Sequence, residues 1–223
     1  MANSEQRTAE VRYDGGVDDV TAFILAGGRS TRMGADKALL SVGRQTLLER
    51  ALHTAAAVAH TVFIVGPRDR YGRYGDVAED VFRDCGPLGG IHAALCMTQT
   101  DLNLMLSVDT PLMTSDFLIW LLEQARPSRE LIVVPEALGG LQPLAGVYHR
   151  SLRAVAEQAL KSGDYKIDHL FPLAPTRYIS EAEMRAAGFS PTVFRNVNTF
   201  EEYEDLLQEA EPLGARKTES NGE

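Results

Sequence analysis

The chain has 223 residues, of which 44% are hydrophobic and 24% are charged, and its formal net charge is −9 at pH 7. This composition is typical of a globular protein with a sizeable core, and the length fits one large domain. The negative charge argues against nucleic acid or an anionic membrane as a partner. The sequence has neither an apolar run of membrane-spanning length nor a hydrophobic signal core, which predicts a cytoplasmic location.

Short apolar runs alternate with helical patterns along residues 19–211, which we expect to form a single domain. Residues 1–18 and 212–223 are polar, and we expect them to be a loose extension and a mobile tail. Strands are predicted over residues 21–26, 61–66, 77–78, 103–108 and 131–135. Helices are predicted over residues 46–58, 88–97, 115–125 and 151–161. This alternation predicts an α/β fold whose mostly parallel sheet is covered by helices on both faces.

The first predicted strand runs into a glycine-rich loop. Gly27 and Gly28 allow a tight turn and bring backbone N–H groups close to phosphate oxygens. The basic residues that follow are Arg29, Arg32 and Lys37. The segment has neither the G-x-G-x-x-G pattern nor a P-loop pattern, and we interpret it as another kind of nucleotide-phosphate site. The alternative is a basic surface turn between a strand and a helix.

Two further strand ends carry carboxylates. Asp109 follows the apolar strand at residues 103–108, and Asp80 with Glu79 follows the short strand at residues 77–78. Ligands of parallel sheets collect at the carboxyl ends of the strands. Mg²⁺ takes one or two carboxylates plus substrate phosphates, so Asp109 is a candidate ligand. The alternative for Asp109 is an Asx turn that leaves the strand.

Residues 86–91 form another glycine-rich turn, in which Pro87 suits the first turn of a helix. The small residues would let a base or a second substrate approach the backbone, and simple entry into a helix is the alternative. Arg68, Arg70 and Arg73 are interpreted as solvated surface residues. The two cysteines, Cys85 and Cys96, lack C-x-x-C spacing and are expected to be free thiols.

The second half of the chain is less informative. Residues 141–148 are predicted to be a β-segment, and Pro143 favours a position at the sheet edge. Residues 194–198 are predicted to be a last short strand. Thr199 and Glu202 then form a capping box, which opens a helix expected to reach about Ala210.

These features together resemble the molybdenum cofactor guanylyltransferases, within the wider nucleotidyltransferase family of Rossmann-like α/β domains. The matching segments are Leu25-Ala26-Gly27-Gly28, Arg32-Met33-Gly34, Asp36-Lys37, Gly86-Pro87-Leu88, Val108-Asp109-Thr110-Pro111 and Asn196-Val197-Asn198-Thr199. They occur in the family's order and cover nearly all of the chain except its tails. The resemblance implies a three-layer sandwich like that of the nucleotide-diphospho-sugar transferases.

The resemblance also implies a reaction in which GTP and Mo-molybdopterin give molybdopterin guanine dinucleotide and pyrophosphate with the help of Mg²⁺. The terminal phosphate of molybdopterin would attack the α-phosphorus of GTP, so no protein nucleophile is required. A monomer is expected, with transient contacts to proteins of cofactor synthesis or to acceptor proteins.

The family pattern assigns roles to individual residues. Those expected to bind the nucleotide are Leu25, Ala26, Gly27, Gly28, Lys37, Val65, Asp80 and Asp109. Lys37 would hold phosphates, Arg32 would stabilise the pyrophosphate, Asp109 would bind Mg²⁺ and Asn198 would complete the metal site. Two positions depart from the pattern. Val65 stands where relatives can carry a polar side chain, and Gln142 stands where some have histidine before the proline.

Three other kinds of protein share some of these motifs. Molybdopterin cytidylyltransferases tend to have Ala-Ala-Gly where this chain has Ala26-Gly27-Gly28. Sugar-phosphate and isoprenoid-pathway nucleotidyltransferases tend to end the loop with Pro-Lys, whereas Asp36 precedes Lys37 here. A GTP-binding module without catalysis would not require a metal carboxylate, so the presence of Asp109 argues against it.

Overall fold

In the computed structural model the described residues are 20–26, 36–42, 44–197, 199, 201–202 and 204–205. The sheet is built around β1 (Val20–Leu25), all six residues of which are buried. β1 pairs in parallel with β4 (Thr61–Val65) on one side and with β6 (Leu102–Ser107) on the other. Helices cover both faces of such a sheet, so its central strand is apolar on both sides.

Within the described part of the chain, eight strands form one sheet in the order β10-β7-β9-β6-β1-β4-β5, with β8 paired to β7. The remaining strands of this sheet are β5 (Val77–Ala78), β7 (Ile132–Ala137), β8 (Gly140–Leu141), β9 (Ala145–His149) and β10 (Thr176–Ile179). β9 runs antiparallel to both of its neighbours, β6 and β7. A separate antiparallel pair consists of β2 (Ser41–Val42) and β3 (Gln45–Thr46).

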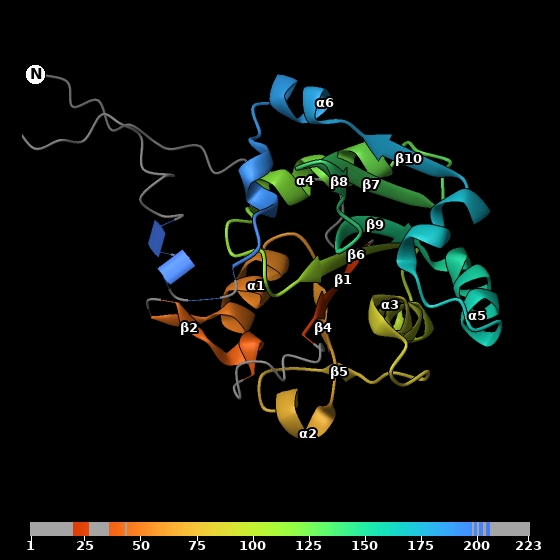
Figure 1. Ribbon diagram of the computed structural model, residues 1–223, viewed down its shortest axis with the longest axis horizontal. Coiled ribbons are helices and arrows are strands. Elements are labelled where there is room, and N and C mark those ends of the chain that lie inside the picture. The colour runs from red at the N-terminus through yellow and green to blue at the C-terminus, as the bar shows by residue number, and fades with distance from the viewer. Residues whose placement is uncertain are drawn as a thin grey trace, which may run out of the picture.

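Helices lie on both faces of the sheet (Figure 1). One face carries α1 (Leu47–Ala56), α4 (Ser115–Ala125) and α6 (Glu181–Ala186). The opposite face carries α3 (Gly86–Met97) and α5 (Arg153–Lys161), which pack against each other. The short helix α2 (Arg68–Tyr71) lies beyond β5 (Figure 1). The 3-10 turns are η2 (Lys37–Leu39), η3 (Arg150–Leu152), η4 (Ile167–His169), η5 (Phe171–Leu173) and η6 (Pro191–Phe194). The expected three-layer α/β sandwich is thereby confirmed.

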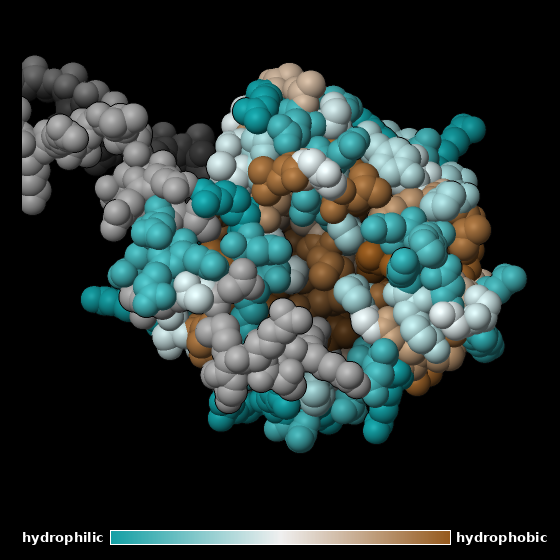
Figure 2. Space-filling model, viewed as in Figure 1, coloured by the Kyte–Doolittle hydropathy of each residue, from teal (hydrophilic) through white to brown (hydrophobic). Residues whose placement is uncertain are grey.

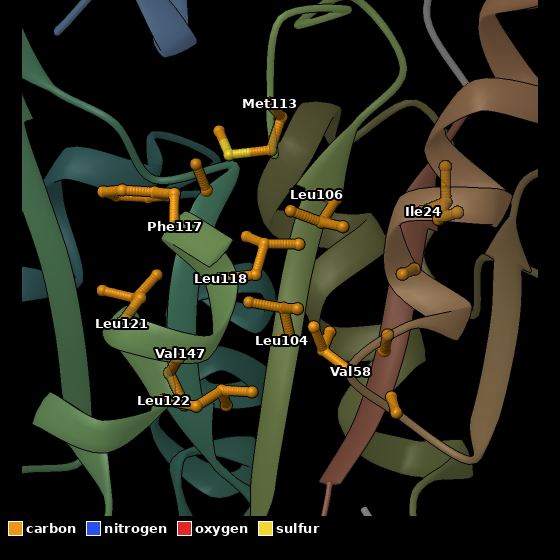
Figure 3. Close-up of a cluster of buried hydrophobic side chains, with 14 of the residues drawn as sticks. Ile24, Val58, Leu104, Leu106, Met113, Phe117, Leu118, Leu121, Leu122 and Val147 are labelled. Atoms are coloured by element: carbon orange, nitrogen blue, oxygen red, sulfur yellow. The ribbon is translucent and has the colours of Figure 1, made fainter. Parts of the chain in front are cut away.

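The core on the α4 face joins this helix to the centre of the sheet. The side chain of Leu118 on α4 points toward Leu104 and Leu106 of β6 (Figure 3). Phe117 is fully buried, and its ring lies 5.2 Å from that of Phe194 and 5.4 Å from that of Phe189. These edge-to-face contacts attach the last described turns of the chain to α4.

The core on the opposite face is built on α3. Eight consecutive residues of this helix, from Leu88 to Leu95, are buried. A helix that is apolar on all sides is one that neighbours enclose, and α3 packs against β1, β4 and β5 of the sheet and against its neighbour α5. Phe23 and Leu25 of β1 belong to the same cluster. β1 therefore contributes alternate side chains to both cores.

Most predicted elements are confirmed with small shifts at their ends. The predicted capping box at the start of α1 is present, because Thr46 and Glu49 bond to each other's backbone N–H groups. The two cysteines are free thiols, as expected. Across the described residues, no helix is long and apolar enough to cross a membrane. The predicted extension and tail lie outside the described residues.

The prediction of one edge β-segment over residues 141–148 is wrong. β8 ends at Leu141 and β9 begins at Ala145, with a turn between them in which the Ala145 N–H donates to Gln142 O at 3.0 Å. β9 then lies inside the sheet, between β7 and β6. Pro143 falls in the turn, where its missing N–H removes no bond of the ladder.

The predicted strand over residues 194–198 is also wrong as far as the structure describes it. Phe194 ends the 3-10 turn η6, whose first residue Pro191 follows the capping residue Ser190. Residues 195–197 belong to no strand. After them, the Thr199 and Glu202 capping bonds are present at 3.3 and 3.1 Å. Residues 201–202 and 204–205 are helical, and the rest of the predicted helix lies outside the described residues.

Candidate active site

The carboxyl ends of four neighbouring strands meet at one edge of the sheet. The Ala26 N–H donates to Val65 O at 3.1 Å, which joins the ends of β1 and β4. The Val108 N–H donates to Leu25 O at 3.4 Å, which joins β6 to β1. The end of β5 is held by Gly66, whose N–H donates to Ala78 O at 3.1 Å. The residues that follow these strands therefore share one edge, as expected for parallel strands.

Lys37 and Asp109 meet at this edge although 72 residues separate them. The Lys37 Nζ atom lies 3.2 Å from Asp109 Oδ2, and the two side chains are 19% and 26% exposed. The ion pair is partly shielded from water but reachable by a ligand. These are two of the predicted catalytic residues, and the structure brings them together.

The turn after β6 fixes the position of Asp109. Thr110 Oγ1 donates to Ser107 O at 3.2 Å, and the Met113 N–H donates to Thr110 O at 3.1 Å. The carbonyl of Asp109 accepts a bond from the Val197 N–H at 2.9 Å. This contact brings Val197, which precedes the predicted metal ligand Asn198 in the sequence, to the backbone of Asp109. Asn198 itself lies outside the described residues.

Lys37 is the first residue of η2, which Asp36 caps. The Ala38 N–H donates to Asp36 Oδ1 at 3.1 Å, and Ala38 is fully buried. Tyr71 also contacts the carboxylate, and its hydroxyl lies 2.8 Å from Asp36 Oδ2. The same hydroxyl lies 3.0 Å from the carbonyl oxygen of Ala26.

Tyr71 is the residue of this site that the sequence does not reveal. It stands in the arginine-rich segment that we interpret as solvated surface, yet it is 1% exposed. The interpretation holds for Arg68 and Arg70, whose side chains are 60% and 53% exposed. The sequence shows only an aromatic residue among charged ones at this position. That pattern does not predict which groups the tyrosine hydroxyl contacts.

Asp80 lies apart from the ion pair, at the end of β5. It lines an open cavity of about 420 Å³ together with Gly66, Pro67, Asp69, Glu79, Arg83 and Asp84. Desolvation of the carboxyl and the nearby charge of Asp84 raise the pKa of Asp80 above its ordinary value. Three interstrand spacings separate the ends of β6 and β5, which corresponds to about 14 Å.

The other predicted nucleotide contacts on β1 and β4 are backbone or packing positions. Val65 is 3% exposed and Leu25 is 7% exposed. A Cβ atom on Gly90 would lie 3.1 Å from Leu25 Cδ2 and 3.2 Å from Val65 Cγ1. The glycine thus allows α3 to approach the two strands closely, which favours helix entry and packing as the role of this turn. Gly86 has a φ of +63°, which also suits a glycine at the start of α3.

Gln142 is part of the turn between β8 and β9. Its Nε2 atom donates to Ala137 O at 2.8 Å, and its backbone N–H donates to Pro135 O at 2.8 Å. The side chain therefore holds the hairpin of β7 and β8. Because β7 is parallel to β6, this hairpin lies at the same edge of the sheet as Asp109.

The space-filling view shows apolar residues in a hollow near the middle of one face, with hydrophilic residues around it (Figure 2). Figure 1 places β1 and β6 at the same position in this view. The predicted site residues Gly27, Gly28 and Arg32 lie outside the described residues. The described residues contain no group of three or more His, Cys, Asp or Glu side chains that could hold a metal ion.

Comparisons with known proteins identify the family of the chain. The family model for the MobA-like NTP transferase domain matches residues 22–175. The chain is 36% identical over 181 residues to a "Probable molybdenum cofactor guanylyltransferase" of Pelotomaculum thermopropionicum, and the match covers 80% of this chain and 87% of that protein. It is 33% identical over 191 residues to a molybdenum cofactor guanylyltransferase of Desulfosudis oleivorans, with 84% and 94% covered.

A solved structure shares the fold. Molybdopterin-guanine dinucleotide biosynthesis protein A from Archaeoglobus fulgidus superposes with a TM-score of 0.73 at 21% sequence identity, covering 84% of this chain and 97% of that one. The family match spans the strand ends that carry Lys37, Asp80 and Asp109. The chain therefore belongs to the MobA-like NTP transferase family.

Proposed function

We propose that the chain transfers GMP from GTP to Mo-molybdopterin, which forms molybdopterin guanine dinucleotide and releases pyrophosphate. The observation that carries this proposal is the Lys37–Asp109 pair, 3.2 Å apart at the strand edge where the glycine-rich segment begins. The names of the relatives support the choice of substrates, because two of them at 36% and 33% identity are named molybdenum cofactor guanylyltransferases.

The reaction needs alignment and charge neutralisation more than covalent chemistry by the protein. An oxygen of the terminal phosphate of molybdopterin attacks the α-phosphorus of GTP, and a new P–O bond forms. The bond from the α-phosphorus to the oxygen bridging to the β-phosphate breaks, and pyrophosphate leaves with that electron pair. Such transfers depend on positioning and on stabilising the charge of the phosphate oxygens.

Lys37 is suited to bind the phosphates of GTP. Its ammonium group is partly shielded from water, and charge-assisted bonds to phosphate are stronger than neutral ones. In the ligand-free pair the charge of Lys37 is balanced by Asp109. We infer that a bound triphosphate takes over the Lys37 ammonium group and that Asp109 is then available to a cation.

Asp109 fits the requirements of a magnesium ligand. Mg²⁺ usually binds through one or two carboxylates plus substrate phosphates, so a single carboxylate beside the phosphate-binding lysine is sufficient. When bound there, Mg²⁺ would supply Lewis-acid stabilisation of the phosphate oxygens. Asn198 stays a predicted second ligand.

The cavity at Asp80 is suited to a guanine base. Guanine presents N–H donors on its Watson–Crick edge, including the N2 amino group, and a carboxylate only accepts. The cavity lies about 14 Å along the strand edge from Asp109, by three interstrand spacings. A nucleotide lying across the strand ends would thus place its base at β5 and its phosphates near β1 and β6.

Pyrophosphate release tests the proposal and separates it from the alternatives. The full chain is incubated with Mg²⁺, molybdopterin and either GTP or CTP. Release with GTP alone is the expected result. Release with CTP alone would identify a cytidylyltransferase, and tight GTP binding without release would identify a binding module.

A further inference from the structure

Tyr71 connects the two described segments on either side of residues 27–35. Its hydroxyl lies 3.0 Å from Ala26 O, at the end of β1, and 2.8 and 3.0 Å from the two carboxylate oxygens of Asp36. The residue is 1% exposed and belongs to the core on the α1 and α4 face. One buried hydroxyl therefore joins the end of β1 to the residue that precedes Lys37.

The hydroxyl is a donor to both segments at once. Its one proton is shared between the Ala26 carbonyl and the Asp36 carboxylate, as in the bifurcated bonds that are common at the ends of helices. Burial, and then the bond to the Asp36 carboxylate, raise the pKa of Tyr71 far above its ordinary value, so the proton stays in place. Arg70 also approaches Asp36, at 3.4 Å, but its side chain is 53% exposed and the ion pair is weak.

The position of Lys37 depends on this contact through Asp36. Asp36 accepts a bond from the Ala38 N–H and thereby caps η2, which begins at Lys37. The side chain of Lys37 leaves this turn and reaches Asp109 at 3.2 Å. A shift of Asp36 would move the start of η2 and with it the lysine.

We propose that Tyr71 is a positioning residue: its hydroxyl holds Asp36 against the end of β1 and so keeps the Lys37 ammonium group at Asp109. The part of this inference that concerns GTP rests on the proposed function. The part that concerns the position of Lys37 does not, because it can be measured without a ligand. Tyr71 acts through Asp36 and is not assigned a contact with substrate.

The chain offers a matched control. Tyr148 is fully buried, and its hydroxyl donates to Pro143 O at 2.8 Å on the other side of β1. Tyr71→Phe and Tyr148→Phe each remove one buried hydroxyl that bonds to a carbonyl, so both are expected to lower the melting temperature, and only Tyr71→Phe also loses a bond to a carboxylate. If Tyr71 only stabilised the fold, Tyr71→Phe would change the melting temperature but would affect Lys37 no more than Tyr148→Phe does.

The first experiment is lysine labelling of the ligand-free full chain with an acetylating reagent, followed by mass spectrometry. Lys161 on α5 is the internal reference, because its side chain is 63% exposed and lies far along the chain from the site. Tyr71→Phe should raise the labelling rate of Lys37 severalfold relative to Lys161, and Tyr148→Phe should not. An unchanged rate in Tyr71→Phe, or an equal rise in both variants, would overturn the inference.

The second experiment measures GTP-dependent pyrophosphate release. Tyr71→Phe should raise the KM for GTP about tenfold or more, the order expected for losing a hydrogen bond to a charged group. Asp36→Ala should have a similar effect, and the double variant should be little worse than either, because both changes break the same bond. Fully additive losses would contradict the inference. If the wild-type chain releases no pyrophosphate from GTP, the proposed function fails and the labelling result alone decides the role of Tyr71.

Discussion

Replacing Asp109 by asparagine removes one negative charge from the candidate site and leaves its shape almost unchanged. The partner of this carboxylate is the ammonium group of Lys37, 3.2 Å away. The backbone contacts of the turn, from Val197 and Thr110, do not involve the carboxylate. The variant therefore isolates the electrostatic role of Asp109 from its structural surroundings.

The expected effect on stability is small. Two unit charges at this separation attract by about 5 kcal/mol at an effective dielectric constant of roughly 20. Most of that attraction offsets desolvation and the ordering of two side chains, so a partly exposed pair contributes about 1 kcal/mol or less. The expected effect on turnover is much larger, because removing one preorganised charge-stabilising group typically costs about 10²–10³ in kcat.

The affinity for GTP should change in opposite directions with and without magnesium. Without Mg²⁺, Asp109→Asn should bind GTP more tightly, because the carboxylate no longer repels the phosphates or retains Lys37. With Mg²⁺, the variant should bind GTP more weakly than the wild-type chain. Titration calorimetry with and without Mg²⁺, pyrophosphate release and chemical denaturation measure the three quantities.

Asp101→Asn is the matched control. Its carboxylate is paired with Arg150 at 2.6 Å, in the loop before β6 and hence at the opposite edge of the sheet. It should leave GTP affinity and turnover unchanged. Turnover of Asp109→Asn within tenfold of the wild-type rate would refute the role assigned to Asp109. A loss of several kcal/mol in stability would refute the view that the ion pair contributes little to folding.

Three further predictions concern other parts of the fold. Gly90→Val should destabilise the chain by about 1–3 kcal/mol and weaken GTP binding, because its branched side chain would push α3 away from Leu25 and Val65; thermal unfolding and calorimetry measure the two effects. Asp80→Asn should raise the melting temperature at pH 7 and weaken GTP binding. The folded-state pKa of Asp80 is raised, so its charged form disfavours folding above that pKa, and the difference in melting temperature should disappear as the pH falls and the carboxyl protonates. Phe117→Ala should lower the free energy of unfolding, measured by urea denaturation, by about 3–5 kcal/mol, because it leaves a cavity at a fully buried position. The fraction of this variant that folds should keep the wild-type KM for GTP.

Much of the sheet could be predicted because its central strands are continuous apolar runs. β1 and β6 are buried on both faces, so their sequences consist mostly of apolar residues. The shared edge of Ala26 and Asp109 follows from the parallel pairing of β1 with β6, but the place of Lys37 at that edge also depends on the contacts of Asp36. Local signals were equally reliable at the start of α1, where the capping box depends on residues three positions apart.

Other features depend on contacts that no local pattern carries. The antiparallel direction of β9 arises from the path of the chain around β7, and the Pro143 signal favours an edge strand that does not exist. The elements β10 and α6 lie in the stretch of residues 162–193, whose sequence pattern predicts no helix or strand. The role of Tyr71 depends on Asp36, 35 positions earlier, and on a carbonyl at the end of another strand.

The reversed direction of β9 marks the boundary between two parts of the sheet, which are joined there by the β6–β9 ladder and by the bond from the Ser107 N–H to Leu144 O at 2.9 Å. The strands β6, β1, β4 and β5 form an uninterrupted parallel block, which carries the ion pair and the Asp80 cavity. Because β9 is antiparallel to β6, the start of β9 lies beside the end of β6. Residues 138–144, which precede β9, therefore lie at the same sheet edge as Asp109, next to the parallel block. The turn around Gln142 is thus attached both to β7, through Pro135 O, and to the end of β6, through Ser107. Substitutions in this turn that keep the Leu144 carbonyl in place therefore leave the pairing of the four parallel strands intact.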